Sequence, residues 1–171
     1  DNPRSIVVTD DVTLTASFAV NEYTVHVDAD DHGTVTGSGK YAYGTTVTLT
    51  ATPQTGYHFV EWSDGNTDNP RSIVVTDDVT LTASFAVNEY TVEVNADGNG
   101  VAVGSGKYKH GETAIIGAIP NEHYHFEQWS DGNTENPRSI LVTEDIILTA
   151  EFSIDTYEVI LNSDGDGTTI G

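Results

Sequence analysis

Asp68–Val92 reads DNPRSIVVTDDVTLTASFAVNEYTV, and the same 25 residues also stand at Asp1–Val25, 67 positions earlier. A third copy with several substitutions, ENPRSILVTEDIILTAEFSIDTYEV, begins at Glu135, again 67 residues further on. A fixed period of this size indicates a tandem array of structural repeats. An array supplies length or several similar surfaces, whereas an enzyme needs one asymmetric site. The period therefore bears directly on function.

The repeated stretch has the pattern of a half-buried β-strand, because apolar residues alternate with Thr and Ser from Val79 to Phe85. The same alternation occurs at Tyr23–Val27 and Val47–Ala51, and turn-forming residues follow at Asp30–Gly33 and Ser63–Asn66. No stretch keeps the 3.6-residue period of a helix, and Thr and Val, which favour strands, are abundant. The sequence predicts an all-β fold of about five strands per repeat, with little or no helix.

An aromatic run follows in each repeat. Phe59 and Trp62 are three positions apart, so a regular strand would send them to opposite faces. The second repeat keeps this spacing at Phe126 and Trp129. If both aromatic side chains of a repeat are buried, a β-bulge must lie between them. We expect the tryptophans in the core.

The tyrosines at positions 23, 90 and 157 each begin a Tyr-x-Val motif and set the repeat boundaries. We divide the chain into the end of one repeat (1–20), two full repeats (21–87 and 88–154) and the start of another (155–171). The chain is thus expected to be part of a longer protein. A unit of this size buries only about 60% of its unfolded surface, so neighbouring repeats are expected partners. The connector Ala86–Glu89 lacks Gly and Pro, which predicts a semi-rigid array.

The charge and composition exclude several classes of partner. The formal net charge is −21, from 27 acidic and 6 basic residues, and such a surface repels phosphate backbones and anionic membranes. The absence of cysteine excludes disulfides and thiolate metal sites. No run approaches the roughly 20 apolar residues of a membrane span. We therefore expect no nucleic-acid partner and no membrane insertion.

The order of motifs between Tyr23 and Phe85 is Tyr-x-Val-x-Val, Gly-Thr-Val-x-Gly-Ser-Gly, Tyr-Gly-x-x-Val-x-Leu-x-Ala-x-Pro, Gly-Tyr-x-Phe-x-x-Trp-Ser-Asp-Gly and Val-Thr-x-Asp-Val-Thr-Leu-Thr-Ala-x-Phe. This order resembles the bacterial B-repeats of internalin-type surface proteins, also called Listeria–Bacteroides repeats, and their divergent branch in particular. The resemblance implies a β-grasp-like module in secreted or wall-attached proteins, where such repeats serve as stalks or adhesion segments. It transfers no catalytic residue. Glu61 and Gln128 depart from the glycine that often precedes the family's tryptophan.

Calcium is the one cofactor that residues in the predicted turns suggest. Asn162, Asp164 and Asp166 place oxygen atoms at alternate positions, as at the start of a calcium loop. No copy has a glutamate at the twelfth position, and these residue types are also ordinary in turns. We expect these residues to stabilise turns and expect no cofactor. If calcium does bind, these three residues are the candidates. His123 and His125, two apart on a predicted strand, lack the further ligands that zinc needs.

The two full repeats differ at positions that are expected to face outward. Four changes introduce isoleucine: Thr48 to Ile115, Thr52 to Ile119, Thr80 to Ile147 and, in the last segment, His26 to Ile160. Several new isoleucines on one outer face predict a surface that is covered by something. Tyrosines near the glycine-rich tip are the candidates for glycan contact, namely Tyr41, Tyr43 and Tyr108.

These observations favour a non-enzymatic, extracellular tandem β-repeat that acts as a semi-rigid spacer or stalk of a bacterial cell-surface protein. One alternative is an adhesive module that binds a host or surface glycan or protein. Another is a self-assembling fibre segment, in which the end segments complement neighbouring chains by strand addition.

Overall fold

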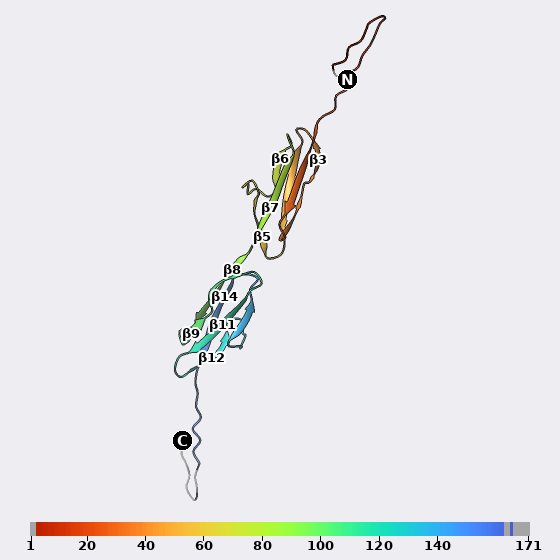
Figure 1. Cartoon of the computed structure of the whole chain (residues 1–171). Coiled ribbons are helices and arrows are strands. Elements are labelled where there is room, and N and C mark those ends of the chain that lie inside the picture. Colours follow the sequence, from red (N-terminus) through yellow and green to blue (C-terminus); the bar gives the residue numbers. More distant parts are fainter. Residues whose placement is uncertain (1–2, 163–164, 166–171) are drawn as a thin grey trace. The chain divides into compact units, whose positions relative to one another are not determined.

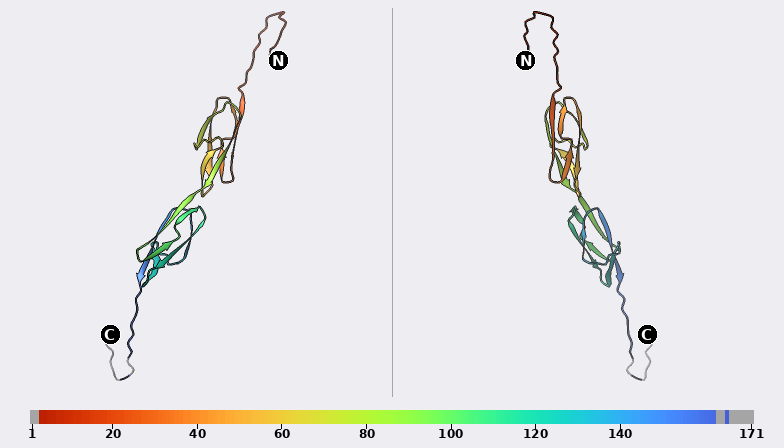
Figure 2. Two further views of the ribbon diagram at one scale, coloured as in Figure 1. Left: turned by 60° about the vertical axis from the view of Figure 1, so that its left-hand side comes forward. Right: turned by 90° about the vertical axis from the view of Figure 1, so that its right-hand side faces the viewer.

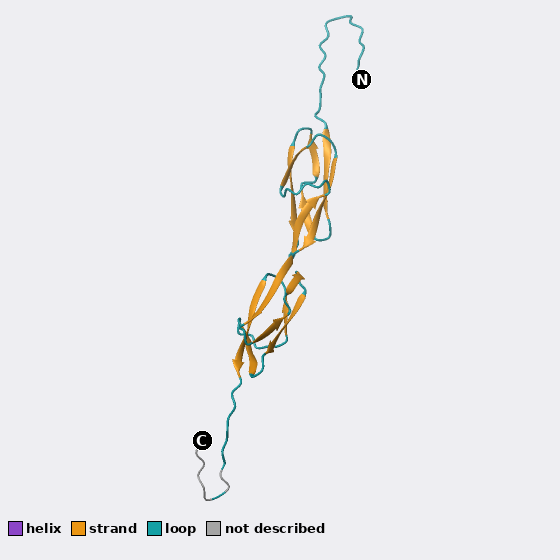
Figure 3. Cartoon of the chain, turned by 90° about the vertical axis from the view of Figure 1, so that its left-hand side faces the viewer, coloured by secondary structure: helices purple, strands orange, loops and turns teal. Residues whose placement is uncertain are grey.

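The computed structural model describes residues 3–162 and residue 165, and residues 22–154 form two modules of the same all-β design (Figure 1). The first module contains β1 (Glu22–Ala29), β2 (Gly33–Thr36), β3 (Gly39–Ala42), β4 (Thr46–Pro53), β5 (Tyr57–Trp62), β6 (Arg71–Val74) and β7 (Val79–Val87). The second contains β8 (Glu89–Ala96), β9 (Gly100–Val103), β10 (Gly106–Lys109), β11 (Thr113–Pro120), β12 (Tyr124–Trp129), β13 (Arg138–Leu141) and β14 (Ile146–Ile154). No helix occurs among the described residues, so the predicted fold class is confirmed (Figure 3).

Each module has seven strands rather than the five expected from the sequence. The two additional strands are β2 and β3, which have four residues each and flank the glycine-rich stretch that begins at Gly37. Gly37 has φ 118, a value that favours glycine and lets the chain turn sharply between them. Strands this short give almost no periodic signal, and these two belong to different sheets. The sequence pattern therefore indicates only a glycine-rich tip at this place.

Two sheets make up each module. The larger has the order β3-β1-β7-β5 in the first module and β10-β8-β14-β12 in the second, and the smaller contains β2-β4-β6 or β9-β11-β13. The two central strands of the larger sheet are the first and last strands of the module, and they are parallel, as in Val25↔Val79 to Ala29↔Ala83. Because these strands point the same way, the chain enters a module at one end and leaves it at the other.

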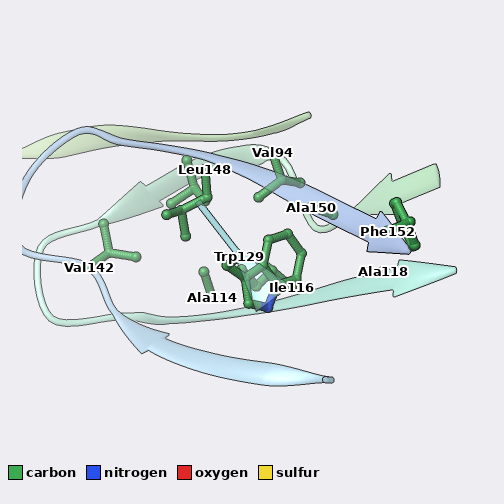
Figure 4. Close-up of a cluster of buried hydrophobic side chains, with 10 residues drawn as sticks. Val94, Ala114, Ile116, Ala118, Trp129, Val142, Leu148, Ala150 and Phe152 are labelled. Carbon is green, nitrogen blue, oxygen red and sulfur yellow. The ribbon is translucent and has the colours of Figure 1, made fainter. Parts of the chain in front are cut away.

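The core lies between the two sheets of a module. Figure 4 shows it in the second module, where alternate residues of the larger sheet meet alternate residues of β11 around the indole of Trp129. Trp62 and Trp129 have no exposed surface, which confirms their predicted burial. Each fully buried Leu, Ile or Val contributes about 1.5–3 kcal/mol through removal from water.

The predicted bulge is present in the second module. Phe126 of β12 pairs with Phe152, and the next pair joins Gln128 to Glu151, so Glu127 is the additional residue. This extra residue restores the phase of the strand. Phe126 and Trp129 consequently face the same core, with ring centroids 5.4 Å apart.

The link between the modules is shorter than expected. β7 continues to Val87 and β8 starts at Glu89, so Asn88 is the one residue between them. Outside the modules, residues 3–20 and 155–162 form no strand and leave the modules as irregular chain (Figure 2). Residues 3–20 nevertheless carry the same sequence as β6 and β7.

Candidate functional site

The loop after each tryptophan is rich in polar residues, and its structure shows how they are used. In the first module Asp64 accepts two hydrogen bonds of 2.7 Å from the guanidinium of Arg71, and Asp68 accepts one of 2.9 Å at its carbonyl from the Trp62 indole. The Arg71 bond holds the pKa of Asp64 below its usual value, although slight burial acts against it. The second module repeats the ion pair at Arg138 and Asp131, with 2.7 Å between the closest atoms. Burial pushes the pKa of Asp131 upward, but the hydrogen bonds from Arg138 and the Asn133 backbone together bring it below its usual value.

An asparagine at the end of this loop takes the place of a strand residue. The side chain of Asn136 accepts the N–H of Ala118 at 2.9 Å and donates to the carbonyl of Ala118 at 2.7 Å. The ladder between β11 and β13 ends at Ile116↔Arg138, and Ala118 and Asn136 stand two positions further along their segments, so the amide continues the ladder there. Asn69 makes the same two bonds to Ala51 in the first module.

The identical residues of this loop are thus occupied by bonds within their own module. The glycine-rich tip follows the same rule. The hydroxyl of Tyr41 donates to the carbonyl of Gly37 at 3.1 Å, and that of Tyr108 donates to Gly104 at 3.0 Å. Both tyrosines are half-buried. Of the three candidate tip tyrosines only Tyr43 is exposed, and its ring lies 6.3 Å from that of Tyr23.

The outer face of the smaller sheet is where the modules differ most. In the first module this face, here the threonine face, is formed by Thr34, Thr36, Thr46, Thr48, Thr50 and Thr52, with Ser72 and Val74. In the second module it is largely aliphatic and has five exposed large side chains, here the aliphatic face: Val101, Val103, Ile115, Ile119 and Leu141. Ile119 lies directly opposite Val101, and Val103 lies opposite Gly117. The outward positions of β9, β11 and β13 include no charged residue.

The four candidate isoleucines do not share one outer face. Ile115 and Ile119 lie on the aliphatic face, but Ile147 belongs to β14 of the larger sheet, where it pairs with Glu93. Ile147 is flanked by core residues of β14, so it points away from the core on the opposite side of the module. Ile160 lies beyond β14 in irregular chain. Alternation along a strand separates inside from outside, but it does not say to which sheet the strand belongs.

Three members of the aliphatic face escaped the sequence comparison. Val101, Val103 and Leu141 stand where the first repeat has Thr34, Thr36 and Val74. The signal was present, because two of these are further changes from threonine to an aliphatic residue. It was missed because β2 and β9, which carry those positions, were not recognised as strands.

The structure places no further ligands, among the residues that it describes, beside the metal candidate Asn162. Asn162 is exposed, and Asp164 and Asp166 lie outside the described residues. Within the part of the chain that the structure describes, no three His, Asp or Glu side chains come together to hold a metal ion. His123 precedes β12 and has φ 70, so it is not on a strand with His125, contrary to the expectation. His125 lies 3.0 Å from the carboxylate of Asp155.

A turn acid of the second module is likewise engaged by its own backbone. One carboxylate oxygen of Asp97 accepts the N–H of Phe152 and the other accepts that of Asn99, each at 2.9 Å. These two bonds, the Phe152 bond first, hold the pKa of Asp97 below its usual value. The geometry is that of a turn acid that joins two strands.

A family model described as the divergent InlB B-repeat domain matches residues 23–89 and 90–156. The chain belongs to this family. The two matched B-repeats adjoin and have the 67-residue period of the sequence. The family is one of repeat domains of surface proteins, and it is not a known enzyme family.

Two relatives come from Evansella cellulosilytica. One, provisionally named a membrane protein, is 26% identical over 162 residues, which cover 89% of this chain and 24% of that protein. Another, provisionally named a Gly-rich membrane protein, is 30% identical over 173 residues, or 91% of this chain and 20% of that protein. The chain therefore spans about a quarter or less of these relatives. No solved structure matches it. No helix among the described residues has the length and apolar character needed to cross a bilayer.

Proposed function

We propose that these B-repeats form a non-enzymatic spacer, the extracellular stalk of a bacterial cell-surface protein. One observation carries the proposal: the parallel pairing of the first and last strands makes the chain enter each module at one end and leave at the other. The next module then begins after a single residue, Asn88. A repeat of this design adds a fixed length each time it is copied, without a flexible linker.

The distribution of identity and charge supports a spacer. The residues shared by the two B-repeats are largely used for internal hydrogen bonds and core packing, as at Asn136 and Trp129. The acidic charge of the chain keeps neighbouring chains apart and in solution. The family of surface-protein repeats supports a position at the cell surface, and the two relatives are named as membrane proteins.

The test is to vary the number of repeats. Chains with one to four additional copies of residues 88–154 are compared by small-angle X-ray scattering. Because a strand of 8 or 9 residues spans roughly 26–30 Å, we expect the maximum dimension to rise linearly by about that amount per repeat. A matched set with a Gly-Ser linker inserted after Asn88 should grow less than linearly. If both sets give the same growth, the connector is not stiff and the spacer proposal fails.

A second candidate function is homophilic adhesion, in which the aliphatic face binds the same face of a second copy. Two such faces meet without placing like charges together, although the chain as a whole carries −21. Five large side chains on this face are between 45% and 64% exposed. A stable dimer buries roughly 800 Å² per partner, and this face offers only five large side chains, so we expect each contact to be weak and to gain from repetition.

The chain supplies its own control for this candidate. Ile115→Thr with Ile119→Thr gives the second module the threonines of the first at two central positions of this face, and Thr48→Ile with Thr52→Ile does the reverse in the first. Sedimentation equilibrium at two protein concentrations should show self-association of the native chain, its loss in the first variant and its increase in the second. A native chain that is monomeric at millimolar concentration contradicts the candidate.

A further inference from the structure

The two strands that connect a module to the rest of the chain are neighbours in the middle of its larger sheet. In the second module β8 and β14 are parallel, and five residue pairs join them, from Val92↔Ile146 to Ala96↔Ala150. In the first module β1 and β7 are joined in the same way. Any pull on the two ends of a module must therefore pass through this one ladder before it reaches another part of the module.

Aspartates extend the ladder at both ends. At its beginning, a carboxylate oxygen of Asp145, just before β14, accepts the N–H of Thr91 at 2.7 Å. At its end, the N–H of Asp97 donates to the carbonyl of Ala150 at 3.1 Å, and its carboxylate accepts the N–H of Phe152 at 2.9 Å. Hydrogen bonds to a carboxylate are roughly twice as strong as those between neutral groups.

The first module repeats much of this arrangement. Asp78 accepts the N–H of Thr24 at 2.7 Å, and the N–H of Asp30 donates to the carbonyl of Ala83 at 3.1 Å. The positions correspond through the 67-residue period, and the residues are aspartate in both modules. The reinforcement of the ladder is thus part of the repeated design.

We propose that each module is a tension-bearing unit whose parallel strand pair, extended by an aspartate at each end, is loaded in shear when the chain is pulled at its ends. The first strand is drawn toward its amino end and the last toward its carboxyl end, so the strands must slide along each other. All rungs of the ladder then carry the load together, whereas pulling both strands at the same end would break the rungs one after another. The inference rests on the proposed spacer function only for the source of the tension.

The direction of pulling can be changed while the chain stays whole. Because the chain has no cysteine, introduced cysteines provide defined attachment points for force spectroscopy. Glu89→Cys with Ile154→Cys attaches the start of β8 and the end of β14 and gives the shear geometry. Glu89→Cys with Glu144→Cys attaches both strands at their beginnings and gives the unzipping geometry. The two proteins differ in one attachment point only, and both leave the aspartates intact.

We expect the unfolding force at equal loading rate to be about twofold higher or more in the shear geometry, because forced unfolding follows the unfolding barrier and several bonds break at once. Equal forces in the two geometries overturn the proposal. In the shear geometry, Asp145→Ala should lower the force and Asp145→Asn should lower it less. An unchanged force in Asp145→Ala contradicts the role of the carboxylate. The length released on unfolding reports whether each variant was folded. If Asp145→Ala does not fold, Asp145→Asn provides the comparison with the native chain.

This result is independent of the repeat-length experiment. If the modules resist shear but the length of the chain does not grow linearly, the tension-bearing role is supported and the spacer proposal fails. Linear growth with equal forces in both pulling directions does the opposite.

Discussion

Some side chains in this protein make the hydrogen bonds that a neighbouring strand's backbone would otherwise make. The amide of Asn136 satisfies both the N–H and the carbonyl of Ala118, a residue that is buried and has no strand partner on that side. The pattern of the sequence gave no indication of this role, because an asparagine before a proline is ordinary in turns. The amide bonds to a residue of β11 that is 18 positions away in the sequence, and only the fold brings the two together.

Removal of this amide should destabilise the second module. Asn136→Ala leaves two backbone groups of Ala118 without a partner, and each such group costs about 1–3 kcal/mol if water does not replace the bond. We expect a loss of about 2 kcal/mol in the free energy of unfolding. Asn136→Asp keeps the acceptor but sets a carboxylate oxygen against the carbonyl of Ala118, so it should not restore the lost stability. Urea titration with hydrogen exchange on peptides of the second module measures both.

The first module is the internal reference for this experiment. Its exchange should not change in the Asn136 variants, whereas Asn69→Ala should reproduce the loss there. A change below about 0.5 kcal/mol in Asn136→Ala would place the amide among ordinary surface residues.

At the scale of elements, the ladders and loops depend on ionised aspartates. The pKa values of Asp64 and Asp97 are lowered in the folded protein, by the Arg71 guanidinium and by the Phe152 and Asn99 N–H groups respectively. Each folded-state pKa is thus below the unfolded value of about 3.9. Their contribution to stability is present above that value and is lost as the pH falls through the lower, folded value.

Protonation of other carboxylates first reduces the repulsion between the acidic groups, which stabilises the modules. Below about pH 4 we expect the loss of the aspartate bonds to destabilise them. Asp64→Asn should lower stability at neutral pH and should flatten the decline below about pH 4. Glu158→Gln, outside the modules, is the control and should leave the curve unchanged. Urea unfolding at a series of pH values measures the effect. An Asp64→Asn curve parallel to that of the native chain contradicts the assignment.

The strands themselves were predictable to different degrees. β1, β4 and β7 have 8 or 9 residues with clear alternation, and the sequence predicted all three. The bulge at Glu127 was predictable on the condition that both aromatic residues are buried, because a regular strand sends residues three apart to opposite faces. β2 and β3 were missed, since four residues are too few to show a period. That omission hid Val101 and Val103 of the aliphatic face.

At the scale of the whole molecule, the same sequence has two structures. Residues 71–74 and 79–87 are β6 and β7, whereas the identical stretch within residues 3–20 forms no strand. Phe85 is buried, but its counterpart Phe18 is 91% exposed. The difference lies in the partners, because β6 pairs with β4, and β7 lies between β1 and β5.

Supplying the partners should therefore fold this segment. If a second copy of residues 21–67 is fused before Asp1, residues 1–20 complete a module of the sequence 21–87. We expect slow hydrogen exchange at residues 12–20 and one additional unfolding step in force spectroscopy. A fused copy in which both Val25 and Val27 are replaced by Asp, which disrupts its core, is the control and should leave exchange fast. Fast exchange in the intact fusion would show that the repeat boundaries are drawn wrongly.

The sequence by itself determined the all-β class, the two-module repeat and the buried tryptophans, because alternation and periodicity are properties of the chain alone. Only the tertiary structure decided which sheet each strand joins, which separates Ile147 from Ile115 and places β8 beside β14. It also decided whether PRSIVVTDDVTLTASFAV forms strands, as at residues 70–87, or none, as at residues 3–20. The physical reason is that a strand satisfies its backbone hydrogen bonds on other strands, so its structure depends on residues distant in the sequence.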